Sequence, residues 1–219
     1  MTSTHFFITG TDTEVGKTFI SVALVSLLQQ QGYKTVGMKP IASGCEWLDG
    51  QWKNEDALAL IKQSQTDLAY SLINPYAFEP AIAPHLAAKQ VGETISLTVL
   101  ESQFTAMRLQ ADAVVVEGAG GWLVPLNDQQ TIADLAKALN LPVVLVVAIK
   151  LGCINHALLT VQAIADSGLK LVGWVANDFL DDSQSTAIIQ SLKQRITAPC
   201  LGIVPRLDQD EDASAYLTL

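Results

Sequence analysis

The sequence predicts an α/β fold in which a doubly wound, mostly parallel sheet carries helices on both faces. Strand-type and helix-type patterns alternate along almost the whole chain, as they do in βαβ units. The strand-type runs are mostly apolar, as expected of strands that are buried on both faces. Hydrophobic residues make up 49% of the 219 and charged residues 16%, which suits a globular chain rather than a disordered one. In such folds, ligands bind at the carboxyl ends of the strands.

Six short apolar runs are the predicted strands, and five patterns with apolar residues at helical spacing are the predicted helices. The strands are expected at residues 5–9, 35–39, 113–117, 142–149, 171–176 and 200–204. The helices are expected at residues 17–31, 96–110, 131–139, 154–167 and 183–196. Gly32 and Gly168 follow two of these helices, where a glycine commonly ends a helix. The repeated strand, helix, strand order implies right-handed crossovers.

Residues 40–94 interrupt this alternation. They contain Pro75, Pro80 and Pro84 and only a weak helical pattern, at residues 55–64, so we predict a long insertion between the second and third strands. Long insertions at strand ends often build the substrate site. No repeat or linker divides the chain, and we therefore expect one domain over residues 1–219. The acidic residues 208–212 are expected to form a solvated loop.

Charge and targeting signals exclude several classes of function. Thirteen Lys and Arg against 22 Asp and Glu give a net charge of −9, which repels nucleic acids and anionic membranes, so a phosphate ligand needs a local site. The apolar run at 141–149 is too short to span a membrane, and the first residues lack a signal peptide, so we expect a cytoplasmic protein. Cys45, Cys153 and Cys200 form no Cys-x-x-Cys pair, which argues against a disulfide framework or a zinc site.

The strongest motif is a phosphate-binding loop at residues 6–18. An apolar strand leads into a loop and then into a helix that begins at Lys17 and Thr18. Backbone N–H groups and the helix N-terminus would hold a phosphate, Lys17 would reach the terminal phosphates, and the Thr18 hydroxyl would bind Mg²⁺. Five residues rather than four separate Gly10 from Gly16, so the loop is a variant. An ordinary turn is the alternative, but the order of elements favours ATP binding and a fold of the P-loop NTPase type.

A second motif follows the third predicted strand, which ends in Glu117 and continues into glycines at 118–121. A carboxylate at this position can hold Mg²⁺, and glycines allow the backbone to approach a triphosphate closely. A tight turn with an incidental glutamate is the alternative interpretation. The phosphate-binding loop upstream favours the metal site.

A third motif lies at the end of the second predicted strand, where Lys39 would point into the same cleft as Lys17. Two ammonium groups suit the charge that develops on a transferred γ-phosphoryl group, and the nearby Ser43 hydroxyl suits an amine or carbamate substrate. Taken alone, Lys39 is more often a solvated strand end. Asp56 likewise has an alternative interpretation, as an acid at a helix N-terminus.

Taken together and in this order, these segments resemble the dethiobiotin synthetase family. The segments are residues 10–18, 39–44, 56, 117–121, 150–156 and 174–178, and the resemblance extends to about Leu207. The lengthened phosphate-binding loop is itself typical of that family. The resemblance implies an ATP- and Mg²⁺-dependent ligase of biotin biosynthesis. It would convert 7,8-diaminopelargonate (7,8-diaminononanoate), CO₂ and ATP into dethiobiotin, ADP and phosphate, through a carbamate and a carbamic-phosphoric anhydride.

The resemblance also assigns roles to individual residues. It implies that Lys17 and Lys39 are catalytic and contact phosphate and carbamate, and that Thr18, Asp56 and Glu117 bind Mg²⁺. The nucleotide would contact Thr13, Glu14, Val15, Gly16, Lys17, Thr18, Glu117, Gly118, Ala119, Gly120, Asn177, Asp178, Pro205, Arg206 and Leu207, the last five around the adenine.

The substrate site implied by the resemblance is shared between the two subunits of a homodimer. Ser43 would contact the substrate in one subunit, and a helix start would bind the substrate carboxylate from the other. That helix start consists of Gly152, Cys153, Ile154 and Asn155. The chain departs from the family in the 183–196 helix, which has no tyrosine to meet the substrate, and in its short C-terminal tail.

Two other P-loop proteins are alternatives. A partitioning or cell-division ATPase switch would share the fold, but such a loop carries an extra lysine where this chain has Thr11, Asp12 and Thr13. Such switches also tend to have a basic surface or a terminal amphipathic helix, unlike a chain of charge −9. An amidotransferase-coupled cobyrinate synthetase would need a glutaminase domain, which we do not expect after Leu207.

Overall fold

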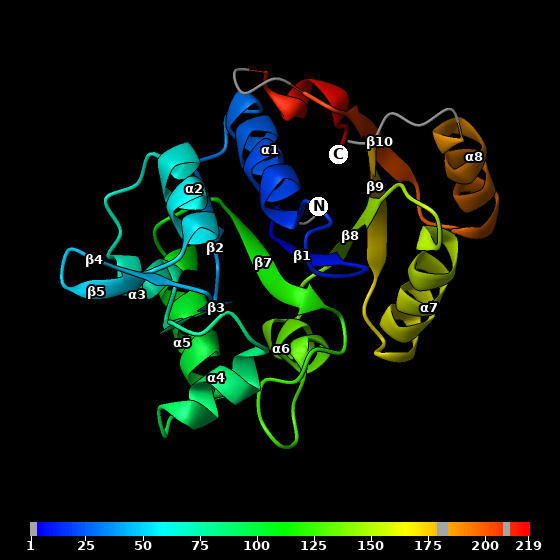
Figure 1. Ribbon diagram of the computed structural model, residues 1–219. Helices are drawn as coiled ribbons and strands as arrows, with labels where there is room; N and C mark the ends of the chain where they lie inside the picture. The colour runs from blue at the N-terminus through cyan, green and yellow to red at the C-terminus, as the bar shows by residue number, and fades with distance from the viewer. Residues whose placement is uncertain (1–3, 179–183, 208–210) are drawn as a thin grey trace.

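A computed structural model describes residues 4–178, 184–207 and 211–219. Its centre is a six-stranded sheet in the order β10-β9-β8-β1-β7-β2, in which all neighbours pair in parallel (Figure 1). The strands are β1 (Phe6–Gly10), β2 (Thr35–Met38), β7 (Ala113–Gly121), β8 (Val143–Ala148), β9 (Leu171–Asp178) and β10 (Cys200–Pro205). Each of the six predicted strands is therefore confirmed, and together they form this sheet.

Helices cover both faces of the sheet, as predicted. The helices that form these two layers are α1 (Lys17–Gln30), α2 (Glu55–Ser64), α5 (Leu97–Arg108), α6 (Ile132–Leu139), α7 (Cys153–Asp166) and α8 (Ser185–Arg195). α1 and α2 pack with Phe6 and Ile8 of β1, whereas α5 and α6 pack with Phe7 on the opposite face. α7 and α8 pack on that second face against Leu145 and Trp174. Figure 1 shows α1 and α6 on opposite sides of β1.

β1 lies near the centre of the sheet, so the phosphate-binding loop that follows it lies between the two halves of the sheet. From β1 the chain crosses to β2 at one edge, and later it runs from β7 through α6 to β8 on the other side of β1. This reversal of strand order is the point where α/β sheets bind ligands. No helix within the described ranges is long and apolar enough to cross a lipid bilayer.

The segment 40–94 contains more regular structure than the sequence predicts. Two short sheets form here, one from β3 (Ile41–Ser43) and β6 (Tyr76–Phe78) and one from the hairpin β4 (Glu46–Leu48) and β5 (Gln51–Lys53). The weak helix expected at 55–64 is α2, and α3 (Tyr70–Ile73) and α4 (Pro84–Gln90) are further helices. Strands of three residues are too short to show an alternating pattern, which is why they were not predicted.

The chain ends in a short 3-10 helix, η1 (Ala213–Tyr216), that packs beside α1. Of the acidic stretch predicted as a solvated loop, residues 208–210 lie outside the described residues, as does Ser183 at the predicted start of α8. Glu211 and Asp212 are exposed, as predicted, and the Asp212 carboxylate also accepts hydrogen bonds from the Ser26 hydroxyl and from the backbone of Ser214. That contact ties the end of the chain to α1.

Candidate functional site

The phosphate-binding loop joins β1 to α1 and has the backbone that a phosphate site requires. Gly16, the residue before α1, has a φ of +87°, and Glu14 also lies in the left-handed region at +58°. A β-carbon on Gly16 would come within 2.1 Å of the Asn177 side-chain nitrogen, so the loop packs directly on the end of β9. Only glycine fits this position, which explains its place in the motif.

Lys17 is buried at the start of α1, and its ammonium donates a hydrogen bond of 2.8 Å to the backbone oxygen of Asp12. Burial and, after it, the nearby charge of Lys39 lower the pKa of Lys17 to about 8, and the carboxylate of Glu117 opposes this change. A phosphate beside this ammonium would offset both unfavourable effects. The side chain therefore favours an anionic ligand in the loop.

Lys39 joins two carboxylates that are far apart in the sequence. Its ammonium lies 2.6 Å from Glu117 Oε1 at the end of β7 and 2.7 Å from Asp56 Oδ2 in the first turn of α2. The Thr18 hydroxyl donates to the same Glu117 oxygen at 2.8 Å. The structure thus brings together Lys39, Asp56, Glu117 and Thr18, which the sequence placed in three separate motifs.

The charges of this cluster stabilise one another. Burial alone would lower the pKa of Lys39, but the carboxylates of Glu117 and Asp56 outweigh it and raise that pKa. For Asp56, burial acts to raise the pKa, and the Lys39 ammonium more than reverses this, so the pKa is lowered. Lys39 is therefore an ammonium paired with carboxylates, whereas the ammonium of Lys17 donates to a backbone oxygen.

Backbone contacts fix the position of Lys39 at the end of β2. Its N–H donates to the carbonyl of Ile73, and its carbonyl accepts from the Asn74 side chain. The Tyr70 hydroxyl in turn donates to Asn74 Oδ1 at 2.7 Å and so holds the Asn74 side chain. Sequence reasoning missed this support from α3, because no motif marks Tyr70 or Asn74.

The cluster offers the oxygen donors that a small divalent cation takes. Glu117 Oε2 is buried and has no hydrogen-bond partner in the described part of the chain. The Thr18 hydroxyl contacts the other oxygen of this carboxylate, and Asp56 contacts the lysine that the carboxylate binds. Hard cations such as Mg²⁺ prefer carboxylate and hydroxyl oxygens. No group of three or more His, Cys, Asp or Glu side chains with metal-binding geometry occurs among residues 4–178, 184–207 and 211–219. A cation here would thus need other oxygens, such as those of phosphate and water.

The glycines after Glu117 line the phosphate-binding loop. β7 continues past the predicted end at Glu117, because Gly121 pairs with Gly10 after a shift of register. Gly120 has a φ of +63°, and a β-carbon there would lie 3.6 Å from the Thr13 hydroxyl. The predicted nucleotide residues 118–120 therefore run beside the loop.

A groove of about 300 Å³ opens on the other side of the loop. It is lined by Glu14, Gly16, Phe19, Asn177, Pro205, Arg206 and Leu207. The Asn177 amide donates to the carbonyl of Val15 at 3.0 Å, and its Oδ1 is buried with no partner within the described ranges. Asp178, also predicted here, does not line the groove, and its carboxylate accepts from the Ser185 hydroxyl at 2.6 Å. Phe19 was missed because no motif includes it.

The predicted substrate residues do not meet within one chain. Ser43 ends β3 on the β2 side of the sheet. Residues 152–155 lie at the start of α7, where Gly152 has a φ of +90° and Cys153 is buried whereas Asn155 is exposed. α7 packs on β8 and β9, and these two strands lie on the opposite side of β1 from β2.

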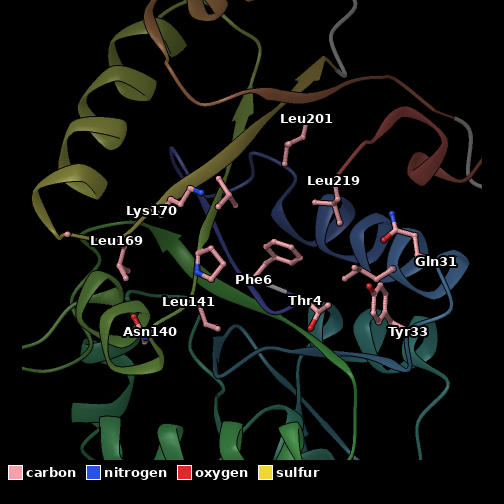
Figure 2. Close-up of a pocket in the computed structure, with 14 residues that line it drawn as sticks. Thr4, Phe6, Gln31, Tyr33, Asn140, Leu141, Leu169, Lys170, Leu201 and Leu219 are labelled. Carbon is pink, nitrogen blue, oxygen red and sulfur yellow. The ribbon is translucent and has the colours of Figure 1, made fainter. Parts of the chain in front are cut away.

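A larger cavity of about 700 Å³ lies at the amino ends of the strands, away from the phosphate-binding loop. Phe6 begins β1, Pro142 precedes β8 and Lys170 precedes β9, and all three line this cavity. Figure 2 shows Phe6 near the middle of these side chains, between Lys170 on one side and Tyr33 on the other. Because the phosphate-binding loop follows the carboxyl end of β1, this cavity is separate from the site.

Comparisons with known proteins agree with this geometry. A protein family described as "AAA domain" matches residues 4–214. An ATP-dependent dethiobiotin synthetase BioD from Cellvibrio japonicus is 51% identical over 100% of this chain and 97% of its own length. One from Pseudomonas aeruginosa is 50% identical over 98% of this chain and 96% of its own.

Solved structures resemble the chain in fold alone. The MinD cell division protein of Aquifex aeolicus matches with a TM-score of 0.60 at 12% identity, over 97% of this chain and 86% of its own. The signal recognition particle receptor FtsY of Elizabethkingia anophelis matches with a TM-score of 0.55 at 13% identity, over 100% of this chain and 63% of its own. These likenesses support the P-loop NTPase-type fold that the sequence predicts.

Proposed function

The chain belongs to the family of ATP-dependent dethiobiotin synthetases, which are ligases of biotin biosynthesis, and we propose that its substrates are 7,8-diaminopelargonate, CO₂ and ATP. The observation that carries this proposal is the cluster beside the phosphate-binding loop, in which the buried Lys39 and Glu117 meet the partly exposed Asp56 and Thr18. An ammonium at this position, in addition to Lys17, suits a reaction in which a second anion meets the γ-phosphate.

The reaction has two group transfers. One amine of the substrate combines with CO₂ to form a carbamate, whose oxygen attacks the γ-phosphorus of ATP while the bond to ADP breaks. The second amine then attacks the carbonyl carbon of the resulting anhydride, phosphate leaves, and the ring closes. Lys17 and Lys39 stabilise the negative charge that these steps place on phosphoryl and carbamate oxygens.

We assign Thr18, Asp56 and Glu117 to Mg²⁺, and the unpartnered Oε2 of Glu117 supports this assignment. Mg²⁺ bound there would neutralise charge on the phosphates of ATP. The glycines at 118–120 support the nucleotide assignment, because residues without side chains let phosphates approach the backbone.

The groove beside the loop is assigned to adenine. The buried Oδ1 of Asn177 is a free acceptor for the adenine amino group, and Phe19, Pro205 and Leu207 provide apolar surface for the ring. Arg206 also lines the groove. The carboxylate of Asp178 accepts from Ser185 and does not line the groove, so we assign base recognition to Asn177 before Asp178.

We propose a homodimer in which the substrate site is shared. The diamine needs one end at Lys39 and Ser43 and a separate anion site for its carboxylate. The start of α7 offers the N–H groups of Ile154 and Asn155 for that carboxylate, since the N–H of Cys153 donates to the Lys150 carbonyl. This helix start lies on the other half of the sheet within one chain. Delivery of this helix start by the partner would complete the site.

A coupled assay of ADP release tests this function. ADP should form only when both 7,8-diaminopelargonate and bicarbonate are present with Mg-ATP, because the phosphate acceptor is a carbamate. Rapid hydrolysis with Mg-ATP alone, or indifference to the diamine, would contradict a ligase and indicate an ATPase switch. Mass spectrometry of the product should show the cyclic urea.

A further inference from the structure

The ammonium of Lys39 holds the same carboxylate oxygens that a metal at this site would use. It lies 2.6 Å from Glu117 Oε1 and 2.7 Å from Asp56 Oδ2. The Lys39 side chain is 6% exposed and that of Glu117 is 0% exposed, so water screens this pair poorly. A cation at this site would therefore need the carboxylate groups that the Lys39 ammonium already contacts.

The two carboxylates of the cluster already have positively charged partners. Two carboxylates, Asp56 and Glu117, face two ammonium groups, Lys39 and Lys17, each of which is electrostatically coupled to the carboxylates. A divalent cation would add two positive charges to this buried group. Like charges repel strongly where solvent is scarce. An ammonium on Glu117 Oε1 thus opposes a cation on the same carboxylate.

Of the two lysines, Lys39 is the one that makes these contacts. The ammonium of Lys17 instead donates to the Asp12 backbone oxygen. The backbone of Lys39 is held at both its N–H and its carbonyl, so a change of partner by the ammonium would have to come from rotations of the side chain alone. A lysine has a flexible four-carbon stem, which allows the ammonium to change partners.

We propose that Lys39 competes with the divalent cation for Asp56 and Glu117, so that the nucleotide-free protein binds the cation weakly. The phosphates of ATP would open the metal site by giving the ammonium another anion to pair with. By linkage, ATP then strengthens cation binding and the cation strengthens ATP binding by the same factor. This inference rests on the proposed assignment of Asp56 and Glu117 as metal ligands.

Binding of Mn²⁺ alone tests the competition, because Mn²⁺ takes the same oxygen ligands as Mg²⁺ and its free form is measured by electron paramagnetic resonance. Nucleotide-free wild-type protein is compared with Lys39→Met, which removes the charge and keeps the stem. We expect Lys39→Met to bind Mn²⁺ more tightly by on the order of tenfold or more, the scale on which one neighbouring charge shifts proton binding. Lys137→Met, which removes an ion-paired lysine of α6, should leave the affinity unchanged.

A double variant locates the effect, and thermal unfolding gives a second measurement. Adding Glu117→Gln to Lys39→Met should abolish the gain in Mn²⁺ affinity. Mg²⁺ should raise the midpoint of thermal unfolding more in Lys39→Met than in wild type, because the cation replaces the lost counter-charge of Glu117. If Lys39→Met does not fold, Lys39→Gln serves the same purpose.

An unchanged Mn²⁺ affinity in a folded Lys39→Met or Lys39→Gln protein would overturn the competition. So would a gain that survives Glu117→Gln. These outcomes are independent of the ligase reaction, since no nucleotide or diamine is present. Failure of the ADP assay with an intact gain in Mn²⁺ affinity would overturn the proposed function and leave the competition standing.

Discussion

Asn177 at the end of β9 lies directly against Gly16 of the phosphate-binding loop. Its amide nitrogen donates to the Val15 carbonyl at 3.0 Å, and it is 2.1 Å from the position that a β-carbon on Gly16 would take. One side chain therefore holds the loop and also lines the groove beside it, while its Oδ1 is buried with no partner among the described residues. This coupling between loop and groove leads to the first two predictions.

Asn177→Ala should weaken nucleotide binding by about tenfold to a hundredfold, because one hydrogen bond to the loop and one acceptor for the base are lost. Calorimetric titration with ADP measures this change. Asn155→Ala at the start of α7 is the matched control, since it should leave ADP affinity unchanged and raise only the KM for the diamine. Normal ADP affinity in Asn177→Ala would remove Asn177 from the nucleotide site.

Gly16→Ala should lower the free energy of unfolding by more than Gly50→Ala does. Both positions have positive φ, +87° and +79°, but nothing lies within 4 Å of a β-carbon at Gly50. Gly50→Ala thus costs only the backbone strain, about 1–2 kcal/mol, whereas Gly16→Ala adds a clash with Asn177. In urea titrations, combining Gly16→Ala with Asn177→Ala should recover the excess. Equal losses in the two single variants would show that the clash relaxes freely.

The two lysines of the site should differ in their effects. Lys17→Ala should weaken nucleotide binding and slow turnover together, because Lys17 lies in the loop. Lys39→Ala should chiefly lower kcat, by on the order of 10²-fold or more, as expected for loss of one preorganised electrostatic donor. Steady-state kinetics separate the two effects, with Lys137→Ala as a control of normal activity. Near-normal turnover in Lys39→Ala would remove its catalytic role.

Glu117→Gln should raise the Mg²⁺ concentration needed for half-maximal activity while metal-free ADP binding stays close to normal. The substitution keeps the size of the side chain and removes its charge. Asp56→Asn should act in the same direction but more weakly, since that side chain is 32% exposed and water can replace part of its contact. Activity measured against Mg²⁺ concentration tests both. An unchanged requirement in Glu117→Gln would make it a structural residue only.

The shared substrate site predicts that two inactive proteins can restore activity in each other. Cys153 is buried, so a charge there would disturb α7 itself, and Asn155→Glu on the exposed surface is the better partner for Lys39→Ala. After subunit exchange, about a quarter of wild-type activity is expected at most, because half of the dimers are mixed and each carries one intact site. Verified exchange without recovery would place the whole site within one chain.

The elements of the sheet could be predicted because their residues are apolar on both faces, which gives a continuous pattern along the chain. β8 is the clearest case, since every residue from Val143 to Ala148 is buried. The hairpin β4–β5 could not be predicted in this way. Its strands have three residues each, and Trp47 is largely exposed although it packs edge to face on Trp52.

The site was predictable where it is carried by a local motif, and less so where it depends on tertiary contacts. Gly16 and Lys17 are adjacent in sequence, so their spacing alone indicates a phosphate site. By contrast, Lys39 and Glu117 are separated by 78 positions, and nothing local indicates that they touch. Phe19 is an apolar residue on a helix, and only the fold shows that it lines a groove.

The central position of β1 has a consequence for how the chain folds during synthesis. β1 is made first, yet its two neighbours in the sheet are β7 and β8, whose residues come more than 100 positions later. Pairing between strands so distant in sequence is slow. At ribosomal rates of about 5–20 residues per second, the apolar strand Phe6–Gly10 therefore waits on the order of ten seconds for both partners. During that time α1, which packs with Phe6 and Ile8 in the folded chain, is the first helix that can cover one face of the strand.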